Sequence, residues 1–111
     1  MELGLQGKVA LVAGASRGLG RAVARGLAEE GCRLAICARR AEALTDAEEE
    51  LTGQFRTEVL RRNVDLAKPG EAEAFAGAAL ERFGRVDILV NNAGTTQYTL
   101  LMRMSEEDWD I

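Results

Sequence analysis

The segment that most constrains the fold of this chain is VALVAGASRGLGRAVARGLAEEG, residues 9 to 31. It opens with a continuous apolar run, Val9 to Ala13, which is typical of a strand buried on both faces in a parallel sheet. Glycines follow at positions 14, 18 and 20. From Gly18 the pattern becomes helical, with an expected inward stripe of Leu19, Val23 and Leu27 and an end at Gly31. The segment therefore predicts a strand, a glycine turn and a helix in direct succession.

The same alternation continues along the chain. Further strands are predicted at 34–38, 57–64 and 86–90, and a second helix at 41–51 with Leu44, Ala47 and Leu51 facing inward. A third helix is predicted from Pro69, in its first turn, to Gly84, which ends it; its stripe is Ala72, Phe75, Ala76, Ala79, Leu80 and Phe83. The acidic run 48–50 is expected to be a solvated face. A polar loop after residue 90 should lead to another helix that begins near Ser105.

Alternating strands and helices predict an α/β fold with a parallel sheet. The expected architecture is one Rossmann-like, doubly wound domain over residues 1–111, with βαβαβαβ element order and strand order 3-2-1-4. The chain's 111 residues fit one domain. In this predicted order the fourth strand lacks an outer neighbour, so we expect the isolated chain to be poorly stable or to associate through that edge.

Composition excludes several classes of function. The net charge is −4 and basic residues are scattered among acidic ones, so no basic stripe is available for a nucleic acid. The chain has no histidine, which excludes histidine proton shuttles and the usual zinc sites, and we expect no metal. Cys32 and Cys37 are expected to be buried thiols in a reducing compartment. No signal peptide or membrane segment is recognisable, which favours a cytoplasmic protein without a membrane partner.

The glycine turn predicts an anion site. Gly14 can turn the chain sharply out of the strand, Gly18 can let the backbone approach a diphosphate, and Gly20 can let the helix lie close to the sheet. The helix start presents unpaired N–H groups and the positive end of the helix dipole. Glycine-rich turns between strands and helices are common, but this one opens the first unit of a βαβ series, which favours a dinucleotide.

Two arginines indicate which dinucleotide. Folds that prefer NAD usually carry an acidic residue at the end of the second strand, where this chain has Ala38 followed by Arg39 and Arg40. Guanidinium groups suit a 2′-phosphate, and Arg17 in the glycine loop could reach the same group. The alternative is that these are ordinary surface arginines. The pattern favours NADP(H) over NAD(H).

Two motifs, VAGASRGLG near the start and VDILVNNAG at 86–94, give the chain a resemblance to the N-terminal half of short-chain dehydrogenases/reductases. With LLMRMSEEDWD, they look most like the 3-oxoacyl-[acyl-carrier-protein] reductases and related carbohydrate dehydrogenases of that family. The resemblance covers essentially the whole chain. It implies that the complete protein is an NADP(H)-dependent oxidoreductase, which transfers hydride between nicotinamide and a carbonyl or secondary alcohol and forms a homo-oligomer, usually a tetramer.

The resemblance also assigns cofactor-binding positions. In the family's glycine motif the chain has Ala13 in place of the usual threonine. The missing hydroxyl should remove one hydrogen bond, worth about 1 kcal/mol, and we expect a looser loop that still functions. Asp65 and Leu66 match a pair that contacts adenine, and Asn91 heads the motif that steadies the fourth strand and borders the ribose. The binding residues that the resemblance implies are Gly14, Ser16, Arg17, Gly18, Leu19, Gly20, Asp65, Leu66, Asn91, Ala93 and Gly94. Arg39 and Arg40 join this set because of their position after the second strand.

The family's catalytic serine and Tyr-x-x-x-Lys motif have no match in these 111 residues. Tyr98 is followed four positions later by Met102, and the two lysines, Lys8 and Lys68, lie elsewhere. We therefore expect no catalytic residue here and interpret the chain as a cofactor-binding half. The alternative is a non-catalytic nucleotide-binding module or a truncated fragment. A Rossmann-type methyltransferase that binds S-adenosylmethionine is disfavoured because it has no use for the NNAG motif.

Overall fold

The protein is described by a computed structural model that covers residues 4–16, 18–65, 68–91 and 99–104, with side chains as far as residue 90. Within these residues, five strands form one sheet: β1 (Val9–Ala13), β2 (Arg33–Ala38), β3 (Val59–Asn63), β4 (Val86–Asn91) and β5 (Thr99–Met104). Their order is β3-β2-β1-β4-β5. The first four strands are parallel, which confirms the predicted α/β fold and the order 3-2-1-4.

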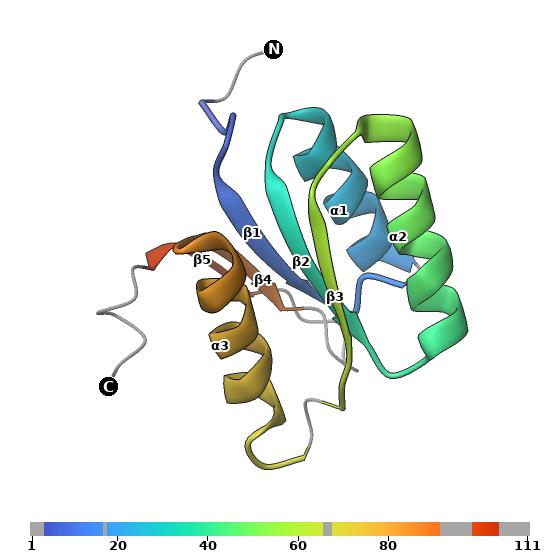
Figure 1. Cartoon of the computed structure of the whole chain (residues 1–111), viewed down its shortest axis with the longest axis vertical. Helices are drawn as coiled ribbons and strands as arrows, with labels where there is room; N and C mark the ends of the chain where they lie inside the picture. The colour runs from blue at the N-terminus through green and yellow to red at the C-terminus, as the bar shows by residue number, and fades with distance from the viewer. Residues whose placement is uncertain (1–3, 17, 66–67, 92–98, 105–111) are drawn as a thin grey trace.

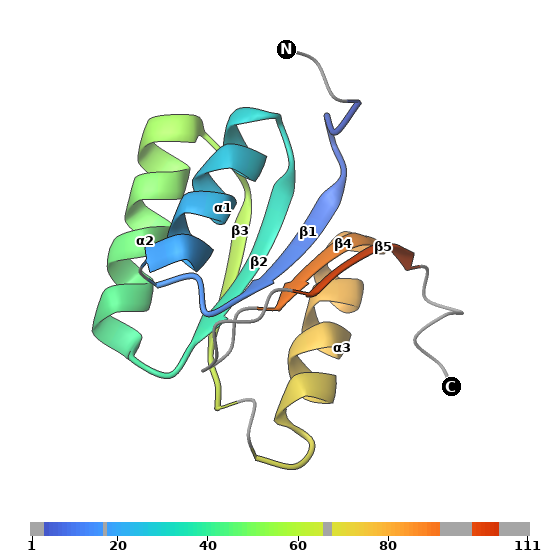
Figure 2. The ribbon, with the colours of Figure 1, turned by 180° about the vertical axis from the view of Figure 1, so that it is seen from behind.

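In the described part of the chain, three helices cover the sheet, as Figures 1 and 2 show from opposite sides. α1 (Gly18–Glu29) and α2 (Ala41–Phe55) lie on one face, and α3 (Glu71–Phe83) lies on the other. β1 is buried at all five positions because its side chains alternate between two cores. Ala10 and Val12 pack in the core beneath α1 and α2, whereas Val9, Leu11 and Ala13 pack with α3.

The fifth strand differs from the prediction. Residues 99–104, which were interpreted as part of a polar loop, pair antiparallel with β4, with Leu89 opposite Leu101. The expectation that β4 has no outer neighbour is therefore wrong, because the chain folds back to supply one. The sheet edge lies at β5 instead. The predicted helix after Ser105 lies outside the described residues.

The inward face of α1 also differs from the expected stripe. The buried residues are Gly20, Ala24 and Ala28, one position away from the predicted set. Leu19 is 61% exposed, while Val23 and Leu27 are partly buried beside the core. Small side chains face the sheet because they let the helix approach it closely, and the larger aliphatic residues then fill the flanks.

The other helices follow their predicted faces with smaller corrections. Leu44, Ala47 and Leu51 of α2 are buried, as predicted. α3 buries Phe75, Ala76, Ala79 and Phe83 and ends at Gly84, also as predicted. The other two residues of its predicted stripe differ, because Ala72 is exposed near the start of the helix and Leu80 is only partly buried. Pro69, however, precedes the helix instead of lying in its first turn: Gly70 is the N-cap, and the helix begins at Glu71.

The acidic run of α2 is only in part a solvated face. Glu49 is exposed, but Glu48 forms an ion pair with Arg61 of β3, and Glu50 forms ion pairs with Arg21 and Arg25 of α1. The partners come from other elements and are distant in sequence. These ion pairs form a charged network between α1, α2 and β3.

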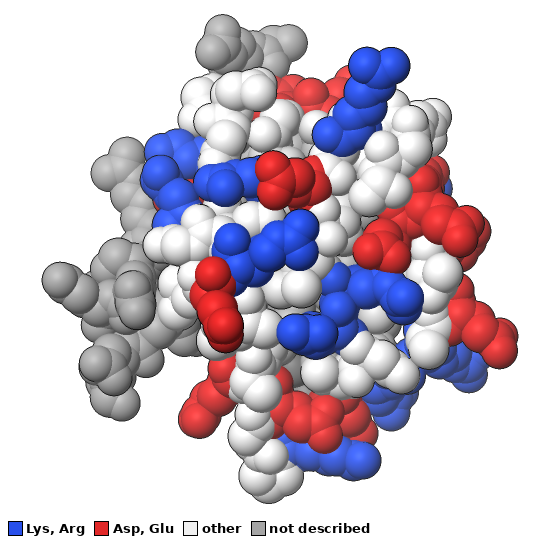
Figure 3. Space-filling model, viewed as in Figure 1, with Lys and Arg blue, Asp and Glu red and all other residues white. Residues whose placement is uncertain are grey.

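The two cysteines are buried free thiols, as predicted. Burial raises the pKa of Cys32 to about 11 and that of Cys37 to about 12, so both remain protonated at neutral pH. On the face that carries α3, Figure 3 shows side chains of both signs intermingled over the described surface. No helix in the described part of the chain combines the length and apolar character needed to cross a bilayer.

Candidate functional site

The parallel register brings the carboxyl ends of four strands to one edge of the sheet. Ala13, at the end of β1, lies opposite Cys37 of β2 on one side and Asn91 of β4 on the other. The chain leaves β1 and β2 toward one face of the sheet but leaves β3 toward the other (Figure 1). β1 and β4 therefore flank the point where the order of the strands reverses. In open parallel sheets, the crevice at that point is where ligands bind.

The loop after β1 is anchored to the neighbouring strand. The backbone N–H groups of Gly14 and Ala15 both donate to the carbonyl oxygen of Cys37, at 2.9 and 3.2 Å. Gly14 has φ of 72° and Gly18 has φ of 61°, so both adopt the left-handed conformation that favours glycine. Apart from the chain neighbours of Gly18 and the nearby backbone of α1, no heavy atom of the described residues lies within 4 Å of the place that a Cβ on Gly18 would occupy. The backbone at Gly18 is thus open to close approach by a ligand.

The start of α1 is electrostatically prepared for an anion. Its first turn contains no acidic residue, in contrast to α2, which has Glu42 there, and α3, which has Glu71 and Glu73. Carboxylates in a first turn interact with the same N–H groups and dipole that an anionic ligand would use. In α1, which starts at the glycine loop, no carboxylate of the first turn therefore offsets the positive end of the helix dipole.

Arg39 and Arg40 directly follow β2, the strand to which this loop is anchored. Both are exposed, and they connect the end of β2 to the start of α2, where Arg40 is the N-cap. Asn63, at the end of β3, steadies the backbone at the end of β2: with its amide nitrogen oriented toward β2, it donates to the carbonyls of Ala38 and Arg39 at 2.9 and 2.6 Å. Sequence reasoning missed Asn63. The one sequence signal for Asn63 was its amide side chain at the end of the strand that pairs with β2.

Asp65 follows β3 at the same edge. Its backbone N–H donates a hydrogen bond to Oε1 of Glu71, the first residue of α3, at 2.7 Å. The structure thus brings the ends of β1, β2 and β3 together, with the candidates Gly14, Ser16, Gly18, Leu19, Gly20, Arg39, Arg40 and Asp65. For Asn91, the backbone pairs with Ala13 in the sheet. Arg17, Leu66, Ala93 and Gly94, as well as the Asn91 side chain, lie outside what the structure describes.

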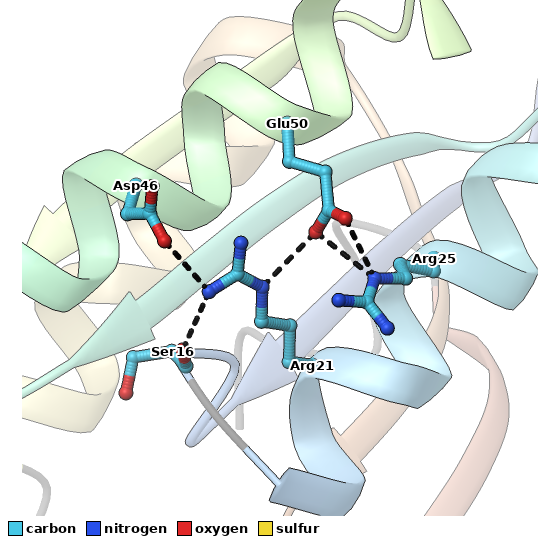
Figure 4. Close-up of polar contacts among 5 residues, drawn as sticks. All are labelled: Ser16, Arg21, Arg25, Asp46 and Glu50. Carbon is cyan, nitrogen blue, oxygen red and sulfur yellow. Dashed lines mark hydrogen bonds and ion pairs between the residues drawn. The ribbon is translucent and has the colours of Figure 1, made fainter. Parts of the chain in front are cut away.

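Sequence reasoning also missed a contact beneath the loop. The carbonyl oxygen of Ser16 accepts a hydrogen bond from Nη1 of Arg21 at 3.4 Å, and the same guanidinium is held by two carboxylates of α2. Figure 4 shows these groups converging between the glycine loop and α2. The partner carboxylates are 25 and 29 residues away in sequence, so no local sequence pattern could predict these contacts.

Taken together, this edge offers backbone amides and guanidinium groups, which are the chemistry for holding phosphates. Proton-transfer groups are scarcer. Lys8 precedes β1 at the opposite edge of the sheet, Lys68 lies before α3, and Tyr98 lies outside the described residues. Among the residues that the structure describes, no group of three or more His, Cys, Asp or Glu side chains is arranged to hold a metal ion.

A family model and curated proteins of similar sequence indicate the same family for this chain. A family model described as short chain dehydrogenase matches residues 8–111. The 3-oxoacyl-[acyl-carrier-protein] reductase FabG of Vibrio cholerae is 44% identical over 112 residues, which cover 96% of this chain and 42% of that protein. The chain thus spans less than half the length of this relative.

Solved structures agree. The L-sorbose reductase of Gluconobacter frateurii, crystallised with NADPH and L-sorbose, superimposes with a TM-score of 0.82 at 39% identity, over 98% of this chain and 41% of that one. An NAD⁺-bound xylitol dehydrogenase gives a TM-score of 0.79 at 34% identity, over 83% of this chain and 35% of that one. The family match, the identity to curated relatives and the shared fold lead to one conclusion: the chain belongs to the short-chain dehydrogenase/reductase family and corresponds to its N-terminal portion.

Proposed function

We propose that this chain is the cofactor-binding portion of an NADP(H)-dependent oxidoreductase. The observation that carries the proposal is the glycine loop at the strand-order reversal, with Gly18 open and the first turn of α1 free of acidic residues. Such a helix start, beside the carboxyl ends of parallel strands, suits the diphosphate of a dinucleotide. Gly14, Ser16, Arg17, Gly18, Leu19 and Gly20 form this part of the site.

The adenosine half of the cofactor falls to the ends of β2 and β3. Arg39 and Arg40 bind the 2′-phosphate, because two exposed guanidinium groups follow β2 where an acidic residue would favour NAD. Asp65 and Leu66 bind adenine, while Asn91, Ala93 and Gly94 border the ribose on the nicotinamide side. One of the similar structures was crystallised with NADPH and another with NAD⁺, so the preference for NADP(H) depends on the arginines.

When bound, the cofactor supplies a hydride donor or acceptor, and the substrate is a carbonyl compound or secondary alcohol of the 3-oxoacyl or sugar type. The described residues bind and orient the cofactor. The proton step belongs to a serine and a Tyr-x-x-x-Lys motif that these 111 residues do not contain. The complete enzyme is proposed to act in the cytoplasm as a homo-oligomer. A coding sequence that continues into those motifs supports the enzyme over a non-catalytic nucleotide-binding module.

The test is a titration of the chain with NADPH and with NADH, followed by cofactor fluorescence. We expect tighter binding of NADPH. Replacing Arg39 and Arg40 by alanine should shrink the difference in binding free energy by about 1.5–3 kcal/mol, the range for hydrogen bonds to a charged group. Arg82→Ala is the control, since Arg82 is exposed in the last turn of α3, at the opposite edge. An NADPH-to-NADH ratio that the double substitution leaves unchanged contradicts the assignment of the 2′-phosphate site.

A further inference from the structure

Arg21 occupies an unusual position for a charged residue on a helix. It lies one turn into α1, and its side chain is only 19% exposed. Its guanidinium contacts two carboxylates of α2, with Nη1 3.0 Å from Asp46 and Nε 3.0 Å from Glu50. The same Nη1 donates to the carbonyl oxygen of Ser16 at 3.4 Å. Arg21 thus joins the glycine loop, α1 and α2 (Figure 4).

The carboxylates that hold Arg21 are themselves fixed. Glu50 also pairs with Arg25 at 2.9 Å, and its side chain is 21% exposed. Hydrogen bonds from Arg25 and Arg21 outweigh the effect of burial and lower the pKa of Glu50, so it remains ionised at neutral pH. The neighbouring Glu48 pairs with Arg61 of β3. α2 therefore offers Arg21 a rigid anchor that is tied to the sheet as well as to α1.

The charges in this network balance. Arg21 and Arg25 face Asp46 and Glu50, two positive groups against two negative ones. A neutralised guanidinium adds little net attraction for a phosphate at the loop. What Arg21 can supply is geometry, because its hydrogen bond restrains the Ser16 carbonyl, and this carbonyl moves together with the rest of its planar peptide group.

From these contacts we infer that Arg21 is a positioning residue for the glycine loop: anchored by Asp46 and Glu50, it holds the Ser16 peptide in the arrangement that receives the cofactor diphosphate. This rests on the proposed function of the loop. α2 begins directly after Arg39 and Arg40, so the same contacts also set the diphosphate part of the site relative to the 2′-phosphate part. Arg21 acts on a portion that NADPH and NADH share, whereas Arg39 and Arg40 act on the group that distinguishes them.

Arg25 provides a matched control. It is on the same helix and pairs with the same Glu50, and the contacts found for it in the described chain do not include the glycine loop. Arg21→Gln and Arg25→Gln each remove one positive charge from the network. Arg21→Lys keeps the charge, but a single ammonium group cannot span the three groups that the planar guanidinium reaches.

The first measurement is hydrogen–deuterium exchange of the unliganded chain over residues 14–20. We expect Arg21→Gln and Arg21→Lys to speed exchange in this segment, and Arg25→Gln to leave it near the wild-type rate. Circular dichroism melting of each variant verifies that it is folded. Equal exchange in the Arg21 and Arg25 variants, or an Arg21→Lys chain that matches the wild type, overturns the inference.

The second measurement is titration of the same proteins with NADPH and with NADH. Arg21→Gln should weaken both by about tenfold, as expected for the loss of one charge-assisted hydrogen bond, and leave their ratio unchanged. Weakening of NADPH alone overturns the inference, because it places Arg21 at the 2′-phosphate. A wild-type chain that binds neither dinucleotide refutes the proposed function instead, and the exchange comparison still decides whether Arg21 holds the loop.

Discussion

At the residue scale, Asp87 is a buried charge that ties β1 to β4. One of its oxygens accepts the backbone N–H of Val9 at 2.9 Å, and Arg85 donates to both oxygens at 2.8 and 2.6 Å. Burial alone would raise the pKa of Asp87, but the hydrogen bonds from Arg85 and Val9 outweigh it and lower the pKa below its ordinary value. Asp87 thus secures the edge of the sheet opposite the glycine loop.

Replacing Asp87 with asparagine should destabilise the chain by about 1–3 kcal/mol at neutral pH, because Val9 and Arg85 lose a charged acceptor. A carboxyl whose folded pKa is lowered stabilises the fold above its unfolded pKa, about 3.9, and this contribution is lost as the pH falls through the lower folded value. The wild type should therefore lose more stability between pH 5 and this acidic range than Asp87→Asn does. Urea unfolding of both proteins at several pH values measures this difference in stability.

Glu49→Gln on the exposed side of α2 is the control for that series. Its stability should follow the wild type, since the charge it removes is in water and surface charges contribute little. If Asp87→Asn and the wild type lose stability in parallel as the medium is acidified, Asp87 does not have the electrostatic role assigned to it.

At the element scale, α1 lies on the sheet through its smallest residues. Gly20, Ala24 and Ala28 are buried in succession, one turn apart, and Ala24 is completely inaccessible to solvent. This close packing matters for the site, because the helix carries the glycine loop at its start. A change that lifts α1 from the sheet should move the loop as well.

Ala24→Leu should therefore destabilise the fold by about 1–3 kcal/mol, the usual cost of forcing extra methylenes into a packed core. Ala22→Leu places the same side chain on the exposed side of α1 and should change the stability little. Both substitutions keep good helix formers, so helix propensity does not separate them. Thermal unfolding of the two variants makes the comparison. Equal melting temperatures would show that α1 does not pack as closely as described.

At the scale of the whole molecule, the features predictable from sequence were those encoded locally. The run VALVA predicted β1 because a strand buried on both faces is apolar throughout. α2 and α3 were predicted from apolar stripes in which leucine or phenylalanine recurs among the alanines. The inward face of α1 was misplaced because glycine and alanine give a weak hydrophobic signal. The glycine turn and the two arginines were predicted as a site because their chemistry is evident from residue type and order.

The remaining features depend on partners distant in the chain. β5 is a strand because β4 lies beside it, and the sequence of residues 99–104 does not specify that pairing. Arg21 and Glu50 belong to different helices, and they meet only after both helices pack on the same face of the sheet (Figure 4). Asn63 likewise reaches Ala38 and Arg39 through the pairing of β2 with β3. Such contacts follow from tertiary structure alone.

The central claim is that the glycine loop and the arginines after β2 form one site for a pyridine dinucleotide. The most direct test is an NMR titration of the ¹⁵N-labelled chain with NADPH, in which the backbone amide shifts are mapped onto the structure. We predict saturable shifts concentrated at Gly14 to Gly20 and at Arg39 and Arg40. Saturating NADPH that leaves these amides unshifted, or that shifts only residues of α3 and the opposite edge of the sheet, would contradict the claim.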